Sequence, residues 1–153
     1  MPSGYACSRK CNGPPRNDDV RAFMKQPWVM TSSDSSPGHP RAVGSFARKY
    51  DQYVIKEKAI TLAQFIRNSS ALTADTLGLA QRGHLRPGYI ADVVVFDPKH
   101  YAARATYTQP TLLSSGVDTV LVNGQLAIDQ GEPTGIAAGQ ALLRAPKPGT
   151  CPA

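Results

Sequence analysis

The segment TSSDSSPGHPR, residues 31–41, holds the side chains of this sequence that are best suited to chemistry. Asp34 follows a short apolar run among small hydroxyl residues, and His39 and Arg41 come soon after it. A carboxylate can accept and return a proton, and a guanidinium group can bind a carboxylate through two parallel hydrogen bonds. Composition alone leaves a second interpretation open, in which Asp34 caps the next turn or helix.

The other histidines and the cysteines offer less. His84 in RGHLRPG is expected to be structural at a strand edge, and His100 in DPKHY is expected to be structural on a surface turn. Cys7, Cys11 and Cys151 lie in the two tails, and their spacing fits no recognised set of zinc ligands. We therefore expect free thiols and assign no metal ligand to this chain.

The elements that would position residues 31–41 follow from hydrophobic periodicity. Apolar residues at helical spacing predict helices over residues 18–26, ended by Pro27, and over Val43–Lys56. Thr61 and Gln64 form the pattern of a capping box, which predicts the start of another helix. A short helix is expected from Thr73 to Leu77, ended by Gly78.

Several apolar or β-branched runs predict strands. The run WVMT predicts a short strand over Val29–Thr31, of the kind buried on both faces in a parallel sheet. Later strands are predicted over Ala91–Phe96, Thr119–Val122 and Gln125–Asp129. The dipeptide Asn123-Gly124 predicts that the last two form an antiparallel hairpin with a type I′ turn. The parallel-type strand has no predicted parallel neighbour in this chain, which indicates part of a larger fold.

Length and charge limit the possible functions. The 153 residues carry a formal net charge of +6, and the basic excess is scattered over the first third without an aromatic and basic motif. We therefore expect no nucleic-acid partner. No run is long and apolar enough to cross a membrane, so we also expect no membrane partner. Without a secretory signal in this sequence, cytoplasmic localisation is the default expectation.

Three segments resemble a known family. LGLAQRGHLRPGYIADVVVFD and VLVNGQLAIDQGEPTG resemble the segments by which amidohydrolase-superfamily enzymes pass from a metal-dependent (β/α)8 barrel into a small β-domain. DDVRAFMKQPWVMTSSDSSPGHPRAVGSFARKYDQYV resembles the end of the barrel in N-acyl-D-amino-acid deacylases, the D-aminoacylase group. The resemblance extends from Asp18 to Pro152.

The resemblance implies an incomplete α/β fold. Residues 18–80 would be the last strand and helices of the barrel, and residues 81–145 the C-terminal strands of a small β-sandwich domain. Residues 1–17 do not match the family and are expected to form a disordered leader, and residues 146–153 a loose tail. A complete barrel takes about 250 residues, so we expect the C-terminal portion of such an enzyme.

The resemblance also implies roles for the site residues. Asp34 would end the last barrel strand inside the active site and transfer protons during hydrolysis of the amide bond of N-acyl-D-amino acids. Arg41 would bind the substrate carboxylate, and His39 would belong to the same substrate-binding loop. The family often has Gly after the aspartate, where this chain has Ser35.

The parent family uses zinc, but its His-x-His pair and its further ligands are missing from this sequence. We therefore expect no zinc to bind this chain alone and expect the chain alone to be inactive. The alternative is a non-catalytic remnant or interaction module with no chemistry of its own. In either case, apolar surface around Trp28, Val29 and Met30 is expected to favour self-association.

Overall fold

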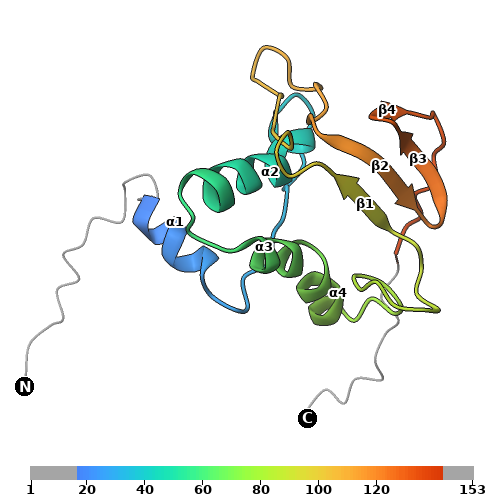
Figure 1. Ribbon diagram of the computed structural model, residues 1–153, viewed down its shortest axis with the longest axis horizontal. Helices are drawn as coiled ribbons and strands as arrows, with labels where there is room; N and C mark the ends of the chain where they lie inside the picture. Colours follow the sequence, from blue (N-terminus) through green and yellow to red (C-terminus); the bar gives the residue numbers. More distant parts are fainter. Residues whose placement is uncertain (1–16, 143–153) are drawn as a thin grey trace, which may run out of the picture.

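The computed structural model describes residues 17–142, in which helices form the first half and an antiparallel sheet the second (Figure 1). The helical elements are α1 (Asn17–Met24), α2 (Arg41–Lys49), the π-helix η1 (Tyr50–Lys56), α3 (Leu62–Ser69) and α4 (Ala71–Leu77). The strands are β1 (Val93–Phe96), β2 (Val117–Val122), β3 (Gln125–Asp129) and β4 (Glu132–Pro133). The three cysteines, the leader apart from Asn17, and the tail at 146–153 lie outside the described residues. None of the helices described is long and apolar enough to cross a membrane.

Local signals set the start of α3 and the end of α4, as predicted, whereas α4 begins at Ala71, before the expected Thr73. The Thr61 hydroxyl accepts a hydrogen bond from the Gln64 backbone N–H at 3.1 Å, and the Gln64 side chain accepts one from the Thr61 N–H at 2.8 Å. This capping box satisfies two N–H groups that a helix start otherwise leaves without partners. Gly78 ends α4 with a φ of +67°, a left-handed conformation that glycine adopts at no steric cost.

The helix predicted over Val43–Lys56 is confirmed as a helical segment, but its winding changes within it. The α-helical part ends at Lys49 and continues as η1, whose wider turns are π-helical. Just past its end, the Glu57 N–H still donates to the Gln52 carbonyl, five residues back, at 2.9 Å. An apolar pattern at helical spacing does not distinguish α from π winding, so the sequence could not predict this change.

The sheet has the order β1-β2-β3-β4, and every neighbouring pair is antiparallel. The predicted hairpin is confirmed, since Val122 pairs with Gln125 across the turn. Asn123 and Gly124 have φ values of +50° and +77°, as a type I′ turn requires of both central residues. The predicted strand Ala91–Phe96 is present in a shorter form as β1.

The strand predicted over Val29–Thr31 is wrong, because these residues have no regular secondary structure. A parallel strand needs a neighbour that accepts and donates its backbone hydrogen bonds. Among the described residues this segment has no such neighbour, and the Thr31 N–H donates instead to the carbonyl of Asn68 in α3 at 2.8 Å. The segment is apolar as a buried strand would be, but the described residues hold no partner strand for it.

An aromatic cluster joins the helices to the sheet. Tyr50 is buried with Ile60 and Phe65, and Phe96 and Tyr101 pack against them from the β-half. The Tyr50 and Phe96 ring centroids are 5.8 Å apart at 75°, an edge-to-face arrangement. The Tyr50 hydroxyl donates to the Pro98 carbonyl at 3.0 Å. The two parts are therefore packed together across the domain boundary expected between residues 80 and 81.

Candidate active site at the start of helix α2

Asp34 lies in the segment that connects α1 to α2. Its φ of +47° is left-handed, a region that aspartate occupies more readily than most residues. The Asp34 N–H donates to the Ser32 hydroxyl at 3.2 Å, which stabilises the local turn. The side chain is 81% exposed, so its carboxylate is open to a substrate or to solvent.

Arg41 is the first residue of α2 and faces Asp34. Its Nη1 lies 3.0 Å from Asp34 Oδ2. The side chain is 39% exposed, and its Nε is buried without a hydrogen-bond acceptor among the described residues. The structure thus brings together two of the three residues that the sequence assigned to a site, and leaves the buried Nε–H of Arg41 without a partner among the described residues.

His39, the third predicted site residue, completes the start of α2. Its Nδ1 accepts a hydrogen bond from the Arg41 backbone N–H at 3.1 Å. Pro40 occupies the N-cap position and makes no side-chain capping bond, so His39 satisfies an N–H that the helix leaves free. The Asp34 carboxylate pairs with a guanidinium group instead of capping α2, contrary to the capping interpretation.

The exposed position of the Asp34–Arg41 pair limits its strength. Ion pairs in contact with water contribute only about 0–1 kcal/mol to stability. A second carboxylate arriving from solvent could therefore take the place of Asp34 on Arg41 at little cost. The pair has the chemistry of an exchangeable anion site beside a proton acceptor.

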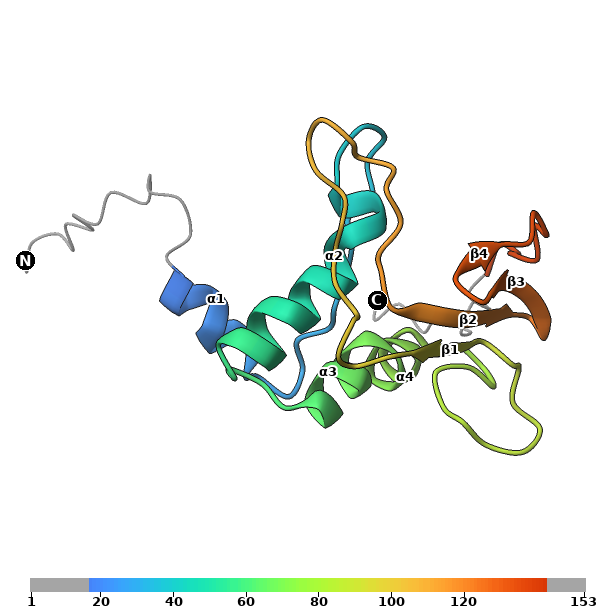
Figure 2. The ribbon, with the colours of Figure 1, turned by 45° about the horizontal axis from the view of Figure 1, so that its top comes forward.

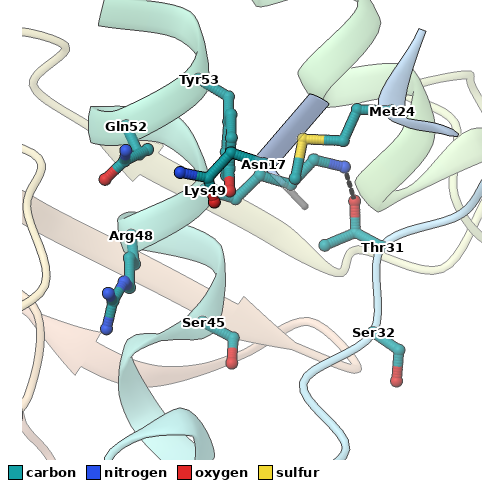
Figure 3. Close-up of a pocket in the computed structure, with 9 residues that line it drawn as sticks. All are labelled: Asn17, Met24, Thr31, Ser32, Ser45, Arg48, Lys49, Gln52 and Tyr53. Atoms are coloured by element: carbon teal, nitrogen blue, oxygen red, sulfur yellow. Dashed lines mark hydrogen bonds between the residues drawn. The ribbon is translucent and has the colours of Figure 1, made fainter. Parts of the chain in front are cut away.

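A hollow of about 510 Å³ opens beside the segment that leads to Asp34, although neither Asp34 nor Arg41 lines it. Figure 3 shows that Lys49 extends into it toward Thr31, whereas Arg48 extends away from Thr31. Lys49 Nζ donates to Thr31 Oγ1 at 2.6 Å, and the Ser69 hydroxyl donates to the same oxygen at 3.0 Å. Burial lowers the pKa of Lys49. The sequence carries no signal that singles out Lys49, because a lysine in a helical pattern ordinarily lies in solvent.

A second, mostly apolar cavity of about 630 Å³ lies where α2 and α3 meet the sheet. Its lining includes Phe46, Ile66, Phe96 and Val120. It contains none of the three predicted site residues.

The remaining two histidines are paired with carboxylates away from Asp34. His84 Nε2 lies 2.9 Å from Asp75 Oδ1, and His100 Nδ1 lies 2.6 Å from Asp97 Oδ2. The hydrogen bond from His100 makes the largest contribution to lowering the pKa of Asp97, and the hydrogen bond from the Lys99 backbone N–H makes the next largest. Within residues 17–142, no three His, Cys, Asp or Glu side chains lie close enough to hold a metal ion.

The chain is similar in sequence to curated deacylases. An N-acyl-D-glutamate deacylase of Alcaligenes xylosoxydans xylosoxydans is 40% identical over 121 residues, which are 76% of this chain and 25% of that enzyme. A D-aminoacylase from the same organism is 37% identical over 130 residues, 82% of this chain and 27% of that enzyme. This chain therefore spans about a quarter of the length of the curated relatives it matches.

Solved structures of the same kinds of enzyme also match this chain. The crystal structure of a D-aminoacylase superposes with a TM-score of 0.75 at 36% identity, over 81% of this chain and 27% of that one. An N-acyl-D-glutamate deacylase from Bordetella bronchiseptica, complexed with zinc and a phosphonate inhibitor, superposes with a TM-score of 0.68 at 43% identity. That match covers 76% of this chain and 26% of that chain.

The match to a family model covers most of the sequence. The model describes the amidohydrolase family and matches residues 11–128. It begins inside the leader, residues 1–17, that we expected to fall outside the resemblance. On this match, and on relatives that are D-aminoacylases and N-acyl-D-glutamate deacylases, the chain belongs to the amidohydrolase family.

Proposed function

We propose that this chain is the part of an N-acyl-D-amino-acid deacylase that supplies a catalytic aspartate and a carboxylate-binding arginine. The reaction would be hydrolysis of the amide bond between an acyl group and a D-amino acid. The observation that carries the proposal is the 3.0 Å pair of Asp34 and Arg41, in a chain whose relatives are D-amino-acid deacylases. Residues 18–80 would correspond to the end of a (β/α)8 barrel, and residues 81–145 to part of a β-sandwich domain.

Arg41 would recognise the substrate. Every N-acyl amino acid carries an α-carboxylate, and a guanidinium group binds a carboxylate through two parallel N–H donors. The two terminal Nη groups of Arg41 offer such a pair of donors, and Nη1 already binds a carboxylate, that of Asp34. The substrate carboxylate would displace Asp34, because the exposed pair is weak.

Asp34 would move protons. Once its partner arginine is taken by the substrate, the carboxylate is free to accept a proton from the water that attacks the acyl carbon. As the carbon–nitrogen bond breaks, the same proton passes to the leaving nitrogen, which departs as an amine. Substrate binding and release of the proton acceptor would therefore be coupled through Arg41.

The metal of the family would have to be held elsewhere. The related Bordetella bronchiseptica enzyme was crystallised with zinc, and the study of one D-aminoacylase describes a binuclear metal centre. The described residues of this chain do not fit such a site, since they contain no cluster of three possible ligands. We therefore propose that the chain alone is inactive.

A chimera tests the proposal. Residues 18–128 of this chain would replace the matching quarter of the Alcaligenes N-acyl-D-glutamate deacylase, and release of free amino acid from N-acetyl-D-glutamate would be measured. We expect the chimera to be active and this chain alone, supplied with zinc, to release nothing. A folded, zinc-loaded chimera without activity would instead favour the alternative, a non-catalytic remnant or interaction module.

A further inference from the structure

The connection between β1 and β2, residues 97–116, extends far from the sheet and lies beside the start of α2. Figures 1 and 2 show it, from two directions, next to the segment that leads into α2. We call residues 97–116 the β1–β2 loop. This connection is much longer than the fold requires, because two antiparallel neighbours can be joined by as few as two residues.

The β1–β2 loop contacts the first turns of α2 at two places. The Ser114 hydroxyl donates to the Val43 carbonyl at 3.1 Å. Gly44 is buried, and a Cβ atom placed there would lie 3.4 Å from the Ala103 methyl group and 3.6 Å from that of Ala105. Both distances are ordinary van der Waals contacts, so the loop lies directly against α2 at Gly44.

The tip of the β1–β2 loop is braced by its own hydrogen bonds. The Thr106 N–H donates to the Gln109 carbonyl and the Gln109 N–H to the Thr106 carbonyl, both at 3.2 Å. The Thr106 hydroxyl also accepts from the Gln109 N–H at 3.1 Å. This closed turn presents Tyr107, which is 77% exposed.

Tyr107 touches the predicted site through His39. The two rings meet edge to face, with centroids 5.2 Å apart and an interplanar angle of 77°, and Tyr107 Oη lies 3.4 Å from His39 Nε2. His39 Nδ1 accepts from the Arg41 N–H, so in the neutral ring the proton is on Nε2 and faces the tyrosine oxygen. A continuous set of contacts thus runs from Tyr107 through His39 to Arg41 and Asp34.

We propose that the β1–β2 loop sets the position of Arg41 for the substrate carboxylate, with Tyr107 and His39 as positioning residues. Tyr107 packs against the His39 ring, and His39 Nδ1 accepts a hydrogen bond from the first N–H of α2. That N–H belongs to Arg41, so the contact fixes the backbone that carries the Arg41 side chain. The proposal rests on the proposed function of this site, and it adds the β-half of the chain to substrate recognition. Neither Tyr107 nor His39 takes part in proton transfer.

The first test uses the whole chain and needs no activity. An N–H at the first position of a helix has no partner within the helix, so slow hydrogen exchange of the Arg41 amide reports the bond to His39. Tyr107→Ala is expected to speed this exchange by up to about tenfold, the range of an aromatic edge contact, while Tyr107→Phe keeps it slow. Tyr89→Ala is the matched control, because Tyr89 also meets a histidine, His84, edge to face at 6.0 Å. Equal exchange in all four proteins would overturn the proposal.

The second test uses the chimera. Tyr107→Ala is expected to raise KM for an N-acetyl-D-amino acid by up to about tenfold, with kcat little changed, because misplacement of a binding group weakens recognition. The α-carboxamide of the same substrate should lose nothing, and Tyr107→Phe and Tyr89→Ala should resemble the parent chimera.

The outcomes separate the two proposals. If the chimera is active and Tyr107→Ala leaves its KM unchanged, the proposed role of the loop is wrong and the proposed function stands. A parent chimera without activity would count against the proposed function, and the exchange of the Arg41 amide would then decide the positioning role by itself.

Discussion

Among single residues, the property of the Asp34–Arg41 ion pair that matters most for the proposed function is its weakness. The two side chains are 81% and 39% exposed, so water screens their attraction. A buried pair of the same geometry would resist displacement, because removing one partner would leave an uncompensated charge. An exposed pair can exchange one carboxylate for another, as the proposed substrate binding at Arg41 requires.

Arg41→Lys in the chimera should separate charge from geometry. Lysine keeps the positive charge but cannot offer two parallel donors, so KM for N-acetyl-D-amino acids should rise by about tenfold. The α-carboxamide of the substrate should be hydrolysed as before, because it never used the contact. Arg48→Lys is the control, since Arg48 is an exposed arginine on the same helix. Equal losses for both substrates would remove Arg41 from the binding site.

Lys49 should make stability depend on alkaline pH. Burial lowers its pKa in the folded chain below the 10.5 of an exposed lysine, so between these two values the unfolded chain binds more protons. Stability therefore rises with pH in that window, as linkage requires. Lys49→Met should be more stable at neutral pH and should lack this rise, which urea unfolding midpoints measured at increasing pH would show. Parallel curves for the two proteins would contradict the account.

Among the elements, those with local determinants were predictable and those with distant partners were not. The hairpin needed only Asn123-Gly124, and α3 needed only the Thr61 capping box. The strand expected over Val29–Thr31 is absent, because the described residues contain no neighbouring strand with which it could pair. The contact of Tyr107 with His39 joins residues 68 positions apart, which no local pattern records.

Thr61→Ala should destabilise the chain through α3. The substitution removes the hydroxyl that accepts the Gln64 N–H, and loss of such a cap costs about 1 kcal/mol. Thr76→Ala removes the same atoms from an exposed position in α4 and should change little. Chemical denaturation of both variants would measure the difference, and equal midpoints would show that the cap contributes nothing.

Across the whole molecule, much apolar surface is left exposed. Trp28 is 61% and Met30 37% exposed, and Val94 and Val95 of β1 are 55% and 48% exposed. The buried hydrophobic residues among those described are few and mostly small or aromatic. Because exposed apolar surface of this kind favours association, we expect gel filtration to give a size that grows with concentration. Trp28→Ser should reduce this growth, and a compact monomer with cooperative unfolding at every concentration would contradict the expectation.

The most direct test of the central claim is kcat of the chimera with Asp34→Asn. Asparagine keeps the shape of the side chain but cannot accept a proton at neutral pH, so kcat should fall by about 100-fold or more with zinc content unchanged. Asp19→Asn, at an exposed position in α1, should leave kcat as it was. Near-normal turnover by the Asp34→Asn chimera would contradict the proposal that this chain supplies the catalytic aspartate.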